Sequence, residues 1–176
     1  MEDLKYWIWF SRLQKFNAMY LYKLLKKFND PKDLFFKTEE ELIRQGIKEK
    51  QAKEILKEEY RVNLDRYIDY MNKNNIDIIT IYDKDYPTKL KEIYDPPVLL
   101  YVKGNKKILK NTGIAIVGCR DCTNYGRNIS KKLAYELALK NINIISGLAR
   151  GIDTSSHLAA LYAKGRTVAV VRLWTR

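Results

Sequence analysis

Two short segments of the chain combine glycine, arginine and serine where runs of apolar residues end. The first is VGCR at residues 117–120, and the second is SGLARGID at residues 146–153. Glycine lacks a Cβ atom, so its backbone amide can approach an anion closely. Arginine offers paired donors that suit a phosphate group, and the serine hydroxyl can donate as well. We therefore predict a phosphate-binding site made of six residues: Gly118, Arg120, Ser146, Gly147, Arg150 and Gly151.

An acidic residue, Asp153, stands beside these predicted anion ligands. Because a carboxylate repels a phosphate, we expect Asp153 or the neighbouring Thr154 to cap the following helix and to hold the turn rigid. His157 lies four positions after Asp153, on the same helical face. The sequence places no nucleophile nearby, so a structural hydrogen bond is the expected role of this histidine.

Alternating strands and helices are expected to position these residues. Apolar runs at 113–118, 142–146 and 167–171 indicate buried strands, and helices are expected over 123–140 and from Asp153 onward. This order is typical of a parallel sheet that is covered by helices, with right-handed crossovers. Ligands of such sheets bind beyond the carboxyl ends of the strands, so the two glycine–arginine segments should lie side by side.

The predicted fold class is therefore α/β, an incomplete Rossmann-like parallel three-layer sheet that follows a small all-α domain. We expect a helical domain over residues 1–60, a connecting helix and strands over 61–110, and the first half of a Rossmann-like DNA-binding domain over 111–176. Four residues of the helix over 123–140 are expected to face the core: Ile129, Leu133, Leu137 and Ala138.

The helical start contains one capping box and one glycine turn. Thr38 and Glu41 have the spacing of a capping box. The turn at Gly46–Ile47 resembles a helix-hairpin-helix, in which turn amides bind a DNA phosphate. A single glycine turn between helices is common, so simple packing of two helices is the favoured interpretation.

Charge favours an anionic partner. The formal net charge is +12, and residues 111–176 hold ten basic and three acidic side chains. Such an excess is typical of nucleic-acid binding. Neither G-x-G-x-x-G nor a P-loop is present, and the single C-x-x-C, Cys119–Cys122, lacks a second ligand pair. We therefore expect no dinucleotide cofactor and no metal. No signal peptide or apolar run of about 20 residues occurs, so a soluble cytoplasmic protein is expected.

Three segments resemble the DNA-processing protein A family, also called DprA or Smf. They are YPTKLKEIYDPPVLLYVKG at 86–104, IAIVGCR…YG at 114–126 and IISGLARGIDTSSHLAAL…GRTVAVV at 144–171. The resemblance implies a non-enzymatic protein of natural transformation that binds and protects incoming single-stranded DNA and loads the RecA recombinase. Carried over residue by residue, Arg120 and Arg150 would clamp phosphates.

The end of the chain departs from this family. After TVAVV at 167–171 the family continues with a glycine-rich turn, whereas this chain reads RLWTR. We interpret this as a C-terminal truncation. The missing half would carry the family's homodimer contact and much of its RecA contact.

Two other functions fit the same residues. A Rossmann-like nucleotide hydrolase of the N-glycosidase type would use the anion site for a mononucleotide, with Asp153 or Asp121 as its carboxylate. Alternatively, the helical domain would bind duplex DNA while the sheet serves as a passive support.

Overall fold

The structure is a computed structural model that describes residues 3–13 and 15–171 of the 176-residue chain. Contacts divide it into two compact units, Met1–Lys106 and Lys107–Arg176. We call them the first and second unit and describe each by itself. The RLWTR ending, where we predicted the departure from the family, lies outside the described residues.

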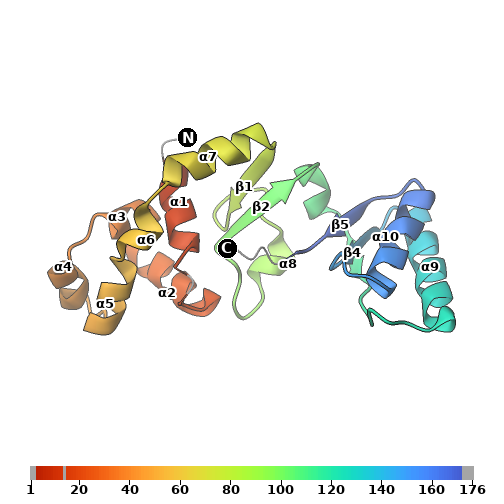
Figure 1. The fold of residues 1–176 in the computed structure, drawn as a ribbon, viewed down its shortest axis with the longest axis horizontal. Coiled ribbons are helices and arrows are strands. Elements are labelled where there is room, and N and C mark those ends of the chain that lie inside the picture. Colours follow the sequence, from red (N-terminus) through yellow and green to blue (C-terminus); the bar gives the residue numbers. More distant parts are fainter. Residues whose placement is uncertain (1–2, 14, 172–176) are drawn as a thin grey trace. The chain divides into compact units, whose positions relative to one another are not determined.

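The first unit begins with short helices (Figure 1). They are α1 (Leu4–Ser11), α2 (Ala18–Phe28), α3 (Pro31–Phe35), α4 (Glu39–Arg44), α5 (Glu49–Ile55), α6 (Glu58–Arg61) and α7 (Leu64–Lys73). Helix α1 is central, because Ile8, Trp9 and Phe10 are almost fully buried and the helix packs against α3 and α7. Burying such aromatic and aliphatic side chains is the main stabilising contribution in a unit of this size.

The predicted capping box is confirmed. The Thr38 hydroxyl accepts a hydrogen bond from the Glu41 amide at 3.3 Å, and the Glu41 carboxylate accepts one from the Thr38 amide at 2.8 Å. At the glycine turn Gly46 has a φ of 80°, and the amides of Gly46 and Ile47 donate to carbonyl groups of α4. These two amides therefore close α4, which favours the packing interpretation of this turn over a phosphate contact.

The segment after α7 packs with the helices. Strands β1 (Ile76–Thr80) and β2 (Leu99–Lys103) pair antiparallel with Ile76 opposite Lys103, and the short helix α8 (Thr88–Lys91) lies between them in the chain. Helix α1 contacts β2, and α7 contacts β1. Most of the expected connecting segment over 61–110 thus belongs to the first unit.

The second unit is a small α/β fold that follows a 3-10 turn, η1 (Lys106–Lys110). Its elements are β3 (Gly113–Ala115), α9 (Asn124–Leu139), β4 (Asn143–Ser146), α10 (Ile152–Tyr162) and β5 (Thr167–Ala169). The strands are parallel in the order β3-β4-β5, so the Rossmann-like α/β fold is confirmed. Helices α9 and α10 pack against each other and both contact β4 (Figure 1). Of the three expected layers, the described residues form the sheet and one helical layer.

The core of the second unit is built from small residues. Its buried cluster is Ala134, Ala138, Ile144, Ala159 and Ala160. Ala138 lies in this cluster and Leu137 packs against it, as predicted, whereas Ile129 and Leu133 are 40% and 48% exposed, so the prediction is wrong for these two residues. The reason is close helix packing: a Cβ atom on Gly165, just after α10, would lie 2.7 Å from the Ala138 Cβ atom. No helix in the described part of the chain is long and apolar enough to cross a membrane.

Candidate nucleic-acid interface

The loops that follow β3 and β4 lie against each other, as predicted. The amide of Ile152 donates to the Cys119 carbonyl at 3.3 Å. A Cβ atom on Gly151 would overlap the carbonyl oxygens of Cys119 and Arg120, and Gly151 has a φ of 85°. Glycine is therefore required at this position both for its backbone conformation and for the close approach of the two loops. We call residues 117–123 and 147–151 together the loop pair.

A single carboxylate connects the two loops. Asp153 is 5% exposed. Its Oδ1 atom accepts the Gly118 amide at 3.3 Å, and its Oδ2 atom accepts the amides of Gly147 and Ala149 at 3.1 and 3.4 Å. Asp153 thus holds the turn rigid, as expected. The expected helix cap is wrong, because α10 is capped by Gly151, without any side-chain hydrogen bond.

Thr154 stabilises the second loop from the same turn of α10. Its hydroxyl donates to the Ala149 carbonyl at 2.6 Å, and its amide donates to the same carbonyl at 3.1 Å. Together, Asp153 and Thr154 leave the backbone between Gly147 and Gly151 little freedom. Because the loop backbone is already ordered, binding through its side chains requires little further ordering of the backbone.

Three of the predicted phosphate donors have other partners. Ser146 is 2% exposed, and its hydroxyl donates to the Ile116 carbonyl at 2.7 Å. The prediction that this hydroxyl donates to a phosphate is therefore wrong, because the group is buried as a link between neighbouring strands. The amides of Gly118 and Gly147 donate to Asp153. Their contribution is to bring the loops together.

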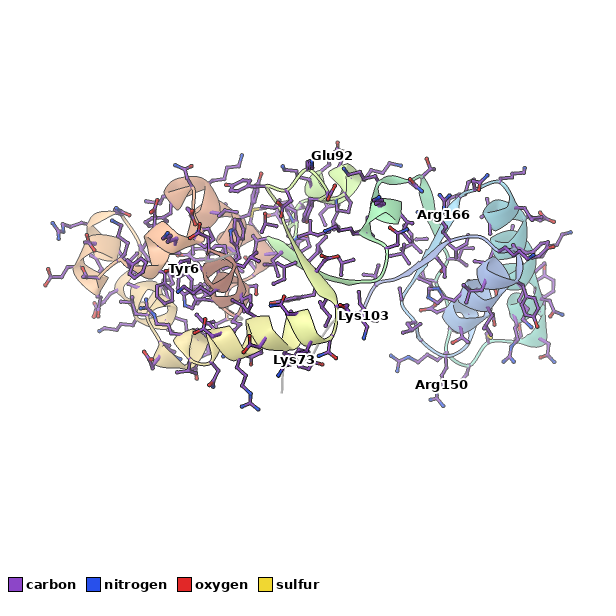
Figure 2. All side chains as sticks on the ribbon, turned by 90° about the horizontal axis from the view of Figure 1, so that it is seen from above. Tyr6, Lys73, Glu92, Lys103, Arg150 and Arg166 are labelled. Atoms are coloured by element: carbon purple, nitrogen blue, oxygen red, sulfur yellow. The ribbon has the colours of Figure 1, made fainter. Side chains whose placement is uncertain are left out.

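The two arginines remain available. Arg120 and Arg150 are exposed, and within the described residues neither side chain forms an ion pair or a hydrogen bond. Figure 2 shows the Arg150 side chain pointing away from the ribbon of the second unit. Arg120 lies in the loop that leads into α9, whose N-cap Thr123 accepts the Gly126 amide at 3.1 Å. Two guanidinium groups on adjoining rigid loops form an arrangement suited to successive phosphates of one strand.

Asp153 and His157 both have structural hydrogen-bond partners. Both oxygens of Asp153 accept backbone amides. The His157 ring contacts the Thr167 hydroxyl through Nδ1 at 2.5 Å, and that hydroxyl donates to the Ile144 carbonyl, so the ring nitrogen is the donor. Burial lowers the pKa of His157, although the Asp153 charge opposes this. The structural role predicted for His157 is confirmed.

The cysteines and acidic residues do not gather into a ligand set. Cys119 and Cys122 are free thiols, exposed and half-buried respectively. Among residues 3–13 and 15–171, no three His, Cys, Asp or Glu side chains lie close enough together to hold a metal ion. The charged groups that the loop pair presents to solvent include the guanidinium groups of Arg120 and Arg150.

Sequence reasoning missed one residue of the loop pair. Leu148 is 61% exposed and has a φ of 57°. The only signal in the sequence was its place between two predicted phosphate ligands, and leucine at such a place gave no reason to expect a left-handed backbone.

Comparison with known proteins gives consistent matches. A family model described as DNA recombination-mediator protein A matches residues 77–173. The chain is 43% identical over 115 residues to the DNA processing protein DprA of Bacillus subtilis, covering 65% of this chain and 39% of that protein. It is 47% identical over 92 residues to the DNA processing protein DprA of Streptococcus pneumoniae, covering 52% of this chain and 32% of that protein.

A solved structure matches nearly the whole chain. The X-ray structure of DNA processing protein A from Streptococcus pneumoniae superposes with a TM-score of 0.71 at 31% identity. This match covers 95% of the present chain and 57% of that chain. The present chain therefore spans little more than half of the solved relative, and the curated matches span 39% and 32% of the relatives' own length.

Proposed function

Because the chain belongs to the DNA recombination-mediator protein A family, we propose that it binds single-stranded DNA through Arg120 and Arg150 of the loop pair. The observation that carries this proposal is that two exposed arginines lie on adjoining loops that share one buried carboxylate. Contacts of this kind recognise the sugar-phosphate backbone, so binding depends little on base sequence and falls with salt.

The same geometry supports a binding role rather than catalysis. An N-glycoside hydrolase needs a carboxylate that is free to act on the substrate. Asp153 is buried with both oxygens hydrogen-bonded, and the exposed Asp121 has no hydrogen bond or ion pair among the described residues that would orient its carboxylate toward a substrate. We therefore propose that the protein holds the strand without cleaving it.

The remaining roles implied by the resemblance belong to the same proposal. We propose that a bound strand is protected and is delivered to a recombinase of the RecA type, with a second copy of the chain as a further partner. The match covers only 57% of the solved relative. We therefore infer these roles of the whole protein from the family and not from the described residues.

The first test measures the affinity for fluorescein-labelled oligo-dT by anisotropy. Losing one charge-assisted contact to a phosphate typically removes about 1.5–3 kcal/mol, so Arg120→Ala and Arg150→Ala are each expected to weaken binding roughly tenfold or more. Lys140→Ala is the matched control, since Lys140 is exposed at the opposite end of α9. The proposal fails if the double arginine variant binds as tightly as the parent.

A further inference from the structure

Leu148 has a backbone conformation that is unusual for its residue type. Within the described residues, six non-glycine residues have a positive φ, and Leu148 is the only apolar one: Asn29, Asn63, Asn75, Asn141, Leu148 and Lys164. A Cβ-bearing residue loses roughly 1–2 kcal/mol in the left-handed region. Asparagine recovers part of this loss by local hydrogen bonds of its side chain, which leucine cannot make.

The surrounding hydrogen bonds impose this conformation. The amides on both sides of Leu148, those of Gly147 and Ala149, donate to the Asp153 carboxylate. The Ala149 carbonyl accepts from both the amide and the hydroxyl of Thr154. Strain that a rigid surrounding maintains is characteristic of functional sites.

Folding buries little of the Leu148 side chain, so burial does little to offset the strain of its backbone. It is 61% exposed, so its transfer out of water contributes only a fraction of what a buried leucine would. A glycine at this position would satisfy the positive φ without strain. The Leu148 side chain is therefore exposed at a position where neither the positive φ nor the packing of the core requires an apolar residue.

A second exposed apolar residue follows the end of the neighbouring strand, β3. Val117 is 69% exposed and directly precedes Gly118. Because the amides of Gly118 and Gly147 donate to the two oxygens of one carboxylate, Val117 and Leu148 stand at neighbouring strand ends. We call these two residues the apolar ledge. It adjoins the loop segments that carry Arg120 and Arg150.

We propose that the apolar ledge, chiefly Leu148, contacts the nucleobases of the strand whose phosphates the two arginines bind. A phosphate alone gives an apolar side chain no partner, whereas a single strand exposes the flat apolar faces of its bases. A duplex keeps these faces stacked, so the ledge also favours single over double strands. This inference rests on the proposed function, because it concerns the same site.

The test compares two ligands of equal charge and length, an oligo-dT and a strand of abasic deoxyribose-phosphate residues. The parent is expected to bind oligo-dT about fivefold or more tightly. Leu148→Gly and Leu148→Asn, which both tolerate a positive φ, are expected to bind the two strands equally. Their midpoints of thermal unfolding should equal or exceed that of the parent, since both relieve the strain at residue 148.

Leu161→Ala serves as the matched control, because Leu161 is 59% exposed near the far end of α10. It should retain the parent's preference for oligo-dT. The inference is overturned if the parent binds both strands equally, or if the Leu148 variants keep the preference. In either case, loss of binding in the Arg120→Ala and Arg150→Ala variants would still support the proposed function, so the two failures are distinguishable.

Discussion

At the scale of single residues, the site depends on Asp153 more than on the glycines around it. One buried carboxylate accepts amides from both loops, at Gly118, Gly147 and Ala149. The placement of the two arginines on adjoining loops could be predicted from the sequence, because both follow strands that were expected to be neighbours in a parallel sheet. The role of Ser146 could not, because whether its hydroxyl faces a neighbouring strand depends on a pairing that one sequence does not reveal.

Removing the Asp153 side chain is expected to destabilise the second unit. Asp153→Ala leaves the three amides without their acceptor inside the loop pair, so we expect a loss of about 3 kcal/mol in the free energy of unfolding. Hydrogen–deuterium exchange of the β4 and α10 peptides would measure this loss. Asp121→Asn is the control, because Asp121 is exposed. Unchanged protection in Asp153→Ala would contradict the structural role of this carboxylate.

His157 should make the second unit sensitive to acid. Burial lowers its pKa in the folded state, with Asp153 opposing, while the unfolded chain titrates near the ordinary value of about 6.5. The unfolded state therefore takes up a proton first as pH falls. Stability from this group is complete above about pH 6.5 and decreases below it, by at most about 1.4 kcal/mol per pH unit.

The measurement compares exchange protection of α10 at pH 7.5 and pH 5.5, corrected for the intrinsic rate. His157→Gln should lose the part of the pH dependence that this ring contributes. If parent and variant respond identically to acid, the ring is not kept neutral by the fold.

At the scale of elements, the order of strands and helices in the second unit follows from the sequence, but the buried face of α9 does not. Apolar runs and their spacing predict β3, α9, β4, α10 and β5. The core, however, uses the alanines of α9 and leaves Leu133 half exposed. Helices that approach each other through small residues bury those residues and turn their larger side chains outward. Hydrophobicity alone therefore indicates the wrong face.

A larger side chain at the contact between α9 and α10 is expected to destabilise the second unit, because the packing there is close. Ala138→Leu places a branched side chain where a Cβ atom on Gly165 would already lie 2.7 Å away. Overpacking of this kind typically costs about 1–3 kcal/mol. Leu133→Ala, on the exposed face, should change stability by less than about 0.5 kcal/mol. Urea unfolding of each variant, followed by hydrogen–deuterium exchange of peptides from the second unit, measures the two free energies of unfolding. Equal stabilities of Ala138→Leu and Leu133→Ala would contradict the packing described.

At the scale of the whole molecule, composition already indicates an anionic partner. The net charge is +12, and the last 66 residues, 111–176, hold ten of the 33 basic side chains but only three of the 21 acidic ones. The division of the chain was harder to predict. Strands β1 and β2 join the helices of the first unit because α1 and α7 pack against them, and such long-range contacts leave no local pattern.

The salt dependence of single-strand binding tests the central claim most directly. For single strands the slope of log K against log salt is about −0.7 for each neutralised phosphate. The Arg120→Ala, Arg150→Ala double variant, titrated with oligo-dT from 50 to 300 mM NaCl, should show a slope shallower than the parent's by about 1.4. Lys140→Ala should keep the parent's slope. A double variant whose slope and affinity both equal the parent's would show that the strand does not bind at the loop pair.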